Sequence, residues 1–389
     1  MAKRSRKKKS RKKKPKKKRP QRVPTLSDDL IVEILCRVPY RSLCRFKGVS
    51  RSWLALCSDP DIRKKSPQTL SGFFCYARVH DDDEHGLRFL NISGRGRPLV
   101  DPSLPFLQGL GYDSFMFKQC CSGLVLCSCR KSSWGSFEAD YVVCNPATRK
   151  WTVLPDTGEQ HNAIHTLCLG FNPSMPSCFY VFLFVLNPSQ YLMRVKIYSS
   201  ETGAWIFRQH EWGDDSIKLN DDAGPVFCNG NLYAVTSDLS LITVDTEGTT
   251  WRKILMPHRS LLAKFLEFEA FITHSQGRLY ATHIDSRNDN QLSIWQFEAD
   301  GNEHWALKHT ASITRLLGRH KDRYNEFYQV IAAHPELNLI FFSGGRDNEL
   351  MSYDLDNQEV RRICTLEKYF QFPVLPYIPC FAEWPTHSH

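Results

Sequence analysis

The residues best suited to metal chemistry are a group of cysteines and a pair of histidines. Thiolates and imidazoles bind zinc when four of them converge. Cys120, Cys121, Cys127 and Cys129 do not form two C-x-x-C knuckles, and the last two alternate in a strand pattern that turns both side chains to one face. His161 and His165 have the spacing of helical metal ligands but no helical pattern around them. We therefore expect the cysteines to pack in a core, and we expect no metal and no cofactor.

Other catalytic patterns are equally weak. The segments "GRGR" at 94–97 and "GGR" at 344–346 offer backbone N–H groups, but neither precedes a helix, so turn formation explains them better than phosphate binding. The acidic run "HDDDEH" at 80–85 reads as a solvated loop. There is no Gly-x-Ser-x-Gly elbow and no Cys with a matched His. The sequence thus favours a protein without catalytic residues.

The net charge of +10 is distributed unevenly along the 389 residues. Residues 3–22, "KRSRKKKSRKKKPKKKRPQR", hold 15 basic and no acidic side chains, whereas the other 36 basic residues face 41 acidic ones. A self-repelling segment without apolar residues cannot offset the entropy of ordering, so 1–22 is expected to be a disordered tail. Its composition suits a nuclear import receptor and equally suits loose, salt-sensitive binding to nucleic acid. The predicted import residues are Lys7, Lys8, Lys9, Arg11, Lys12, Lys13, Lys14, Lys16, Lys17, Lys18 and Arg19.

Composition also bears on the compartment. The 14 cysteines are scattered through apolar runs, which is typical of free thiols in a reducing environment. The longest apolar run, "FYVFLFVL" at 179–186, is far shorter than the about 20 residues of a membrane helix. We therefore expect a soluble protein of the nucleus, with the cytoplasm as a second location.

A helical pattern follows the tail. Ser27 is placed to cap a helix that carries Leu30, Ile31, Ile34 and Leu35 and that Pro39 should end. A second short helix would carry Leu43 and Phe46, a third would begin near Ser50, and Pro60 would mark the end of the unit. Within this unit, assigned to 23–66, the stretch 26–53 holds more apolar side chains than its short helices can bury against one another. The surplus predicts a partner surface.

From about residue 70 the pattern changes to short strands separated by turns. One sequence phrase recurs every 46 to 55 residues. It consists of a strand, a polar turn and then an aromatic residue, and it ends at Trp151, Trp205, Trp251 and Trp305, with Val360 in place of the Trp in the last copy. A second strand–turn–strand phrase, such as "FCNGNLYAV" at 227–235, precedes each. A repeat of this length with several strands is typical of a β-propeller, assigned here to 70–384, and the Trp residues would pack between blades.

We count about six blades, with five or seven left open by the ambiguous ends. Residues 72–108 would form a degenerate blade, and "FPVLPYIPCF" at 372–381 would close the ring by pairing with an N-terminal strand. The fold class is therefore a small all-α module followed by an all-β propeller, behind a disordered basic tail.

The segment "LSDDLIVEILCRVPYRSLCRFKGVSRSW" at 26–53, with "SDPDI" after it, closely resembles an F-box. Ser27 stands where that family usually has Pro. The chain that follows resembles the plant F-box-associated and kelch-like propellers, most clearly in "SGLVLC" and "YVVCNPATRKWTVLP". The resemblance implies a non-enzymatic adaptor of a ubiquitin ligase, in which the F-box binds the Skp-type linker of a cullin-RING complex and the propeller holds a protein target. The residues expected at the linker are Leu26, Leu30, Ile31, Ile34, Leu35, Pro39, Leu43, Phe46, Val49 and Trp53.

The target should bind where long connections leave the propeller, because loops on a rigid scaffold carry most binding function. Candidate inserts are 130–138, 210–222, 285–291 and 317–327. Aromatic and Arg side chains dominate interfaces, which selects Trp134, Trp212, Arg319 and Arg323. The alternative is a nuclear protein that binds nucleic acid or chromatin through its basic tail.

Overall fold

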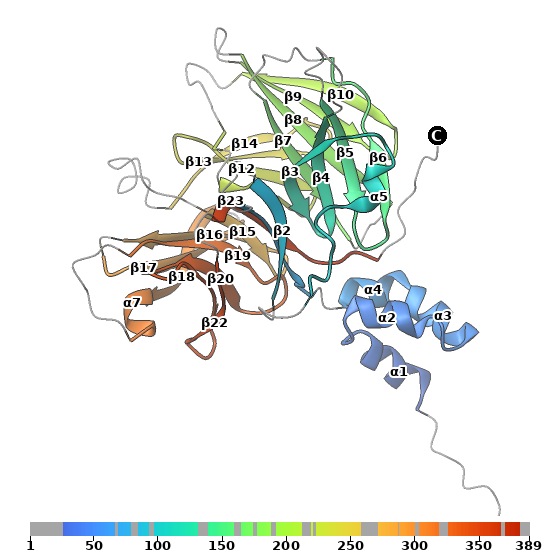
Figure 1. Ribbon diagram of the computed structural model, residues 1–389, viewed down its shortest axis with the longest axis horizontal. Coiled ribbons are helices and arrows are strands. Elements are labelled where there is room, and N and C mark those ends of the chain that lie inside the picture. The colour runs from blue at the N-terminus through green and yellow to red at the C-terminus, as the bar shows by residue number, and fades with distance from the viewer. Residues whose placement is uncertain are drawn as a thin grey trace, which may run out of the picture.

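A computed structural model describes the helical and strand regions that the sequence predicts. The described residues are 26–66, 69–78, 85–92, 97–130, 139–158, 165–173, 177–187, 192–211, 219–220, 223–257, 271–286, 288–299, 303–318, 326–366 and 370–381. They form a helical module followed by a ring of six antiparallel sheets (Figure 1). The helical module and the six-bladed propeller of the predicted fold class are thereby confirmed, whereas the predicted tail, 1–22, lies outside the described residues. None of the described helices is long enough to cross a membrane.

The helical module contains four short helices: α1 (Asp28–Leu35), α2 (Tyr40–Phe46), α3 (Arg51–Ser58) and α4 (Pro60–Lys65). Ser50 caps α3 through its hydroxyl, which accepts a hydrogen bond from the Trp53 N–H at 3.2 Å. Ser27 holds the extended backbone of a capping residue before α1, but its side chain makes no capping bond. The prediction that Pro60 ends the unit was wrong, because α4 begins at this residue. Proline is tolerated in a first helical turn, where its missing N–H would have no partner in any case.

A small apolar core holds these helices together. It consists of Leu35, Leu43, Cys57 and Ile62, all nearly inaccessible to solvent. Phe46 and Trp53 cover it with their rings edge to face, 5.5 Å apart. This core is separate from the five apolar clusters of the propeller, so the module has its own packing.

Five of the six sheets have four strands each, in chain order from the centre outward. Each consists of an inner and an outer hairpin. The inner hairpin is the strand–turn–strand phrase of the sequence repeat, and the outer hairpin is the phrase that ends in the aromatic residue. The strands are β3 (Ser114–Cys121), β4 (Leu124–Arg130), β5 (Ala139–Asn145), β6 (Lys150–Val153), β7 (His165–Phe171), β8 (Phe179–Asn187), β9 (Leu192–Ser199), β10 (Ala204–Glu211), β11 (Val226–Cys228), β12 (Asn231–Val235), β13 (Ser240–Asp245), β14 (Trp251–Leu255), β15 (Phe271–Ser275), β16 (Arg278–Asp285), β17 (Gln291–Glu298), β18 (His304–Ser312), β19 (Tyr328–Ala333), β20 (Leu339–Gly344), β21 (Glu349–Asp354) and β22 (Glu359–Thr365).

The sixth sheet joins the two ends of the propeller. It contains β1 (Gly72–Arg78), β2 (His85–Asn91) and β23 (Phe370–Tyr377), and β23 pairs with β1 from Gly72 opposite Tyr377 to Ala77 opposite Phe370. Figure 1 shows the blue and red strands in this one sheet. As the innermost strand, β23 contacts β19 on one side and β3 on the other. The predicted closure by 372–381 is confirmed, and it leaves no gap in the ring.

Tryptophans of the outermost strands connect neighbouring sheets. The Trp205 Nε1–H donates to the Pro155 carbonyl at 3.0 Å, and the Trp305 Nε1–H donates to the Leu255 carbonyl at 2.9 Å. Trp251 stacks on His210 with ring centres 5.3 Å apart. These contacts confirm the predicted packing between blades for three of the four residues.

Candidate protein-binding surfaces

Helix α1, with Leu26 just before it, presents two apolar stripes on different sides. Residues four apart lie on the same face of a helix, so Ile31 and Leu35 share one face and point into the module's core. Leu26, Leu30 and Ile34 share the other, where their exposed fractions are 58%, 52% and 51%. A stripe of three half-exposed aliphatic side chains is costly in water and is typical of an interface.

Two further apolar residues are exposed on this module. Val49, just before α3, is 62% exposed, and Leu54 of α3 is 48% exposed. Leu54 was absent from the predicted contacts. The signal that could have found it is helical spacing, because Trp53 and Cys57 occupy the inward face of α3 and Leu54 therefore cannot. We name Leu26, Leu30, Ile34, Val49 and Leu54 the apolar face of the module.

The predicted linker contacts divide into three groups. Leu35 and Leu43 are 1% and 0% exposed, so the prediction that they contact a partner is corrected: they hold the module together. Ile31, Phe46 and Trp53 are partly buried against the same core. The exposed ones are Leu26, Leu30, Ile34, Pro39 and Val49. A sequence shows that such residues are apolar, but only packing decides which of them face inward.

The two faces of the propeller differ in the length of their connections. On one face, the short-loop face, turns such as β3–β4 and β5–β6 span two to seven residues. On the opposite face, the long-loop face, four connections span 11 to 15 residues: 154–164, 212–225, 256–270 and 313–327. The helical module is joined to the short-loop face, where β1 begins. The module and the longest connections therefore belong to opposite ends of the ring.

All four residues predicted to contact a target belong to connections on the long-loop face, although the one that holds Trp134, 131–138, is shorter than the four named above. Trp134 lies between β4 and β5, Trp212 between β10 and β11, and Arg319 and Arg323 between β18 and β19. These four residues themselves lie outside the described residues, as do the predicted import residues from Lys7 to Arg19. The topology brings their connections to one face, which sequence spacing alone does not reveal.

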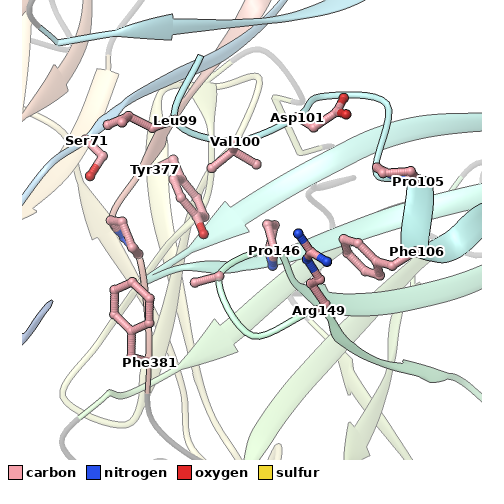
Figure 2. A pocket seen from close by; sticks show the side chains of 12 residues that line it. Ser71, Leu99, Val100, Asp101, Pro105, Phe106, Pro146, Arg149, Tyr377 and Phe381 are labelled. Carbon is pink, nitrogen blue, oxygen red and sulfur yellow. The ribbon is translucent and has the colours of Figure 1, made fainter. Parts of the chain in front are cut away.

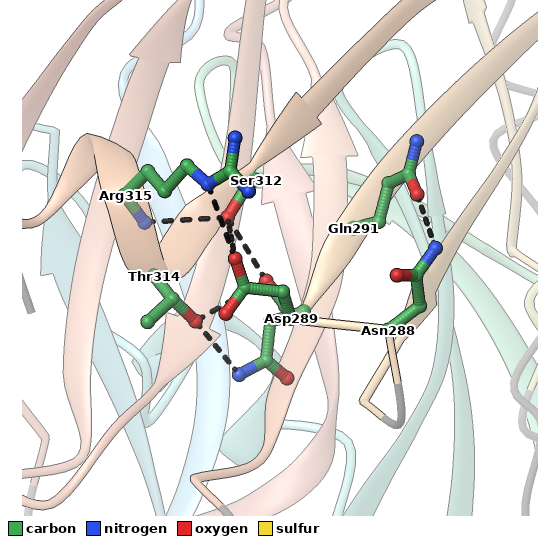
Figure 3. Close-up of polar contacts among 7 residues, drawn as sticks. Asn288, Asp289, Gln291, Ser312, Thr314 and Arg315 are labelled. Carbon is green, nitrogen blue, oxygen red and sulfur yellow. Dashed lines mark hydrogen bonds and ion pairs between the residues drawn. The ribbon is translucent and has the colours of Figure 1, made fainter. Parts of the chain in front are cut away.

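The predicted insert 285–291 meets the start of the 313–327 connection, which contains the predicted insert 317–327, as Figure 3 shows. Asp289 is at the tip of the β16–β17 turn, with the left-handed φ of 56° that a tight hairpin requires. Its carboxylate accepts a hydrogen bond from Ser312 Oγ at 3.0 Å and pairs with Arg315 Nε at 3.3 Å. Its carbonyl accepts from Thr314 Oγ1 at 3.2 Å. Asp289 thus fixes the short helix α7 (Ile313–Leu316), where the 313–327 connection starts.

The innermost strands surround a central cavity of about 350 Å³. Gln119 of β3 lies at this cavity and is 6% exposed. Its Nε2–H donates to the Pro225 carbonyl at 3.0 Å, and its Oε1 accepts from the Leu169 N–H. Leu169 lies in β7 of the next sheet, and Pro225 directly precedes β11 of the sheet after it, so one side chain connects three blades.

The clustered cysteines pack as predicted. Cys127 and Cys129 are fully buried in the sheet of β3 to β6. A hydrogen bond with Cys144, together with burial, raises the pKa of Cys127, and burial raises the pKa of Cys129. Both thiols therefore stay protonated at neutral pH. Within the described ranges, no group of three or more His, Cys, Asp or Glu side chains is arranged to hold a metal ion.

Comparison with known proteins gives two family matches that together cover most of the chain. Residues 24–65 match the F-box domain, and residues 104–370 match the family described as "F-box protein At3g26010-like, beta-propeller". The second match includes all sheets except the one that closes the ring, where only the C-terminal residue 370 of the match falls on β23.

Several proteins of Arabidopsis thaliana are similar over most of their length. F-box protein At5g07610 is 27% identical over 74% of this chain and 71% of its own. Putative F-box/kelch-repeat protein At4g22430 is 23% identical over 86% of this chain and 79% of its own. Putative F-box protein At3g17490 is 30% identical over 85% of this chain and 83% of its own.

Proposed function

The chain belongs to the F-box proteins that carry an At3g26010-like β-propeller, and from this membership we propose that it is the substrate-recognition subunit of a Skp-cullin-F-box ubiquitin ligase. The F-box binds the Skp-type linker, and the propeller holds a protein target. The observation that carries the proposal is the apolar face of the module, which the propeller leaves uncovered. Hydrophobic surface of this kind gains free energy when a partner removes it from water.

Such a subunit acts without chemistry of its own. It holds the target close to the ubiquitin carrier, so that transfer takes place within one assembly and at a high effective concentration. The arrangement of the chain suits this role, because the F-box joins the short-loop face while the longest connections leave the opposite face. We assign target binding to the long-loop face, with Trp134, Trp212, Arg319 and Arg323 as the contact residues.

We also propose that the basic tail directs the protein to the nucleus through an import receptor. The support is its composition, 15 basic side chains within residues 3–22. Deletion of 1–22 should shift a fluorescently tagged chain to the cytoplasm. An unchanged distribution would contradict this assignment.

Binding of the F-box to the Skp-type linker can be tested with two matched double variants. Leu30→Ala with Ile34→Ala truncates two apolar-face residues that are 52% and 51% exposed. Full burial of such a side chain is worth about 1.5–3 kcal/mol, so the exposed half of each contributes about 1 kcal/mol to binding. The variant should therefore bind a Skp-type linker about 30-fold more weakly in calorimetry.

The control removes the same kind of surface from the propeller. Leu255→Ala with Leu307→Ala truncates side chains that are 57% and 54% exposed on β14 and β18. This control should bind the linker like the unmodified chain. Equal affinity of the two double variants would refute the proposed docking surface, and failure of the unmodified chain to bind would refute the proposed function.

A further inference from the structure

A pocket of about 340 Å³ opens on the short-loop face, beside the junction with the F-box (Figure 2). It lies between the β5–β6 turn, the end of β23 and the connection that follows β2. Ser71, which lines it, begins the propeller, and its N–H donates to the Tyr377 carbonyl at 2.9 Å. The size is at the lower end of the range for small-molecule sites. We call it the junction pocket.

Most of the pocket wall is apolar. Leu99, Val100, Phe106 and Phe381 contribute aliphatic and aromatic surface, and prolines complete the lining. Leu99 is 56% exposed, although it is a large aliphatic residue. A ligand with an apolar body would cover this surface.

The hydroxyl of Tyr377 is a buried donor without an acceptor. The residue is 0% exposed, and within the described part of the chain its O–H finds no acceptor. Figure 2 shows the hydroxyl directed into the pocket. The neighbouring Ala147 N–H can only donate, and it already donates to Asn145 Oδ1 at 3.0 Å. Burial raises the pKa of Tyr377, so the group keeps its proton and requires an acceptor.

Arg149 places a cation at the same pocket while its backbone adopts an unfavourable conformation. It holds a left-handed φ of 58°, and its N–H donates to the Asn145 carbonyl at 2.8 Å. In the corresponding turn of the next sheet, Gly203 takes this place, with φ 66° and a matching bond of 2.9 Å to Ser199. Glycine adopts this conformation freely, whereas arginine does not. Among the described residues Arg149 has no ion pair.

We propose that the junction pocket binds the carboxylate of a ligand with a small apolar body. Arg149 and Tyr377 supply charge-assisted hydrogen bonds to the carboxylate oxygens, and the apolar wall takes the rest of the ligand. Asp101 at the rim argues against phosphate, because a second negative charge on the ligand would face this carboxylate. The Asp101 carboxylate already accepts hydrogen bonds from the Ser103 N–H and hydroxyl, at 3.0 and 2.7 Å.

Two sources can provide this chemistry: a free organic acid and the C-terminal carboxylate of a peptide. The probes are therefore 4-phenylbutyrate and N-acetyl-Leu-Phe, each compared with its neutral amide, together with inorganic phosphate. Binding to the full chain is measured by calorimetry and by saturation-transfer NMR. We expect at least one acid to bind about tenfold more tightly than its amide, and phosphate to bind more weakly than that acid. The tighter of the two acids identifies the source.

Variants distinguish binding in the pocket from a general effect of the protein's charge on the acid. Arg149→Gln should weaken binding of the acid about tenfold. Tyr377→Phe should weaken it several-fold and leave the fold intact, because the Tyr377 O–H donates to no acceptor within the described part of the protein. Lys150→Gln removes the same charge one residue away, outside the pocket lining, and should leave the affinity unchanged. Asp101→Asn should tighten binding.

Three results would overturn the proposal. They are equal affinity for an acid and its amide, an unchanged affinity in Arg149→Gln, and no binding of either acid at about 5 mM, a concentration that detects even millimolar sites. Because none of these measurements involves the Skp-type linker, their failure would leave the proposed ligase function untouched.

Discussion

Replacement of Gln119 by Leu should loosen the propeller, because this side chain connects three blades. Leu has a similar size but no polar atoms, so the Leu169 N–H and the Pro225 carbonyl would lose their partner. Leu169 is fully buried, and Pro225 lines the central cavity, where water can replace part of the lost bond. A buried backbone group without a partner costs about 1–3 kcal/mol. The two together should lower the free energy of unfolding by about 2–4 kcal/mol.

This energy corresponds to a measurable shift in melting temperature. The entropy of unfolding is about 2.1 cal/mol/K per residue, which gives about 0.65 kcal/mol/K for a propeller of about 310 residues. The melting temperature of Gln119→Leu should therefore fall by about 3–6 °C in scanning calorimetry of the full chain.

Gln329 of β19 provides the matched control. It lines the same cavity and is half-buried, but its amide makes no hydrogen bond with the described residues. Gln329→Leu should change the free energy of unfolding by less than about 0.5 kcal/mol. If both variants melted at the same temperature, the bonds of Gln119 would not hold the blades together, and the reasoning from unsatisfied backbone groups would fail.

Three further outcomes follow from the structure. Leu35→Ala leaves a cavity in a core of four residues and should lower the free energy of unfolding of the F-box by about 2–5 kcal/mol, enough to unfold it. Residues 26–66 should then become sensitive to limited proteolysis. A variant that stays resistant would contradict the core assignment. Asp289→Ala releases α7, so hydrogen exchange there should accelerate while the melting temperature of the propeller changes little; unchanged exchange would argue against the anchor. Burial lowers the pKa of His334 from its ordinary 6.5 to about 4, so the stability this residue provides is complete above about pH 6.5 and is lost as the pH falls toward 4. Urea midpoints across this window should decline less in His334→Gln, and parallel declines would refute the assignment.

The sequence predicted the repeating elements well, because turns and strands are encoded locally. The recurring strand–turn–aromatic phrase corresponds to the outer hairpin of each four-stranded sheet, and "FPVLPYIPCF" contains most of the strand that closes the ring. The helix ends were less certain. Pro60 begins a helix, since proline is compatible with a first turn as well as with a stop, and the residue type does not distinguish the two.

The docking surface was predicted in part. Residue types identified an apolar excess in 26–53, and this excess follows from composition. Which side chains form the surface depends on how four short helices pack, and that packing turned Leu35 inward and left Ile34 outside, although the two are adjacent in the chain. Leu54 was missed for the same reason.

By itself, the sequence determined a helical module with surplus apolar residues, a propeller of repeated hairpins and a strongly basic tail. These depend on the period of apolar residues, on turn chemistry and on charge, all of which act over a few neighbouring residues. Only the tertiary structure decided that Gln119 joins three blades and that Arg149 meets Tyr377, more than 200 residues away, in one pocket. Such contacts arise because closing the ring between β1 and β23 brings the two ends of the propeller together. Local sequence patterns do not encode contacts between residues so far apart in the chain.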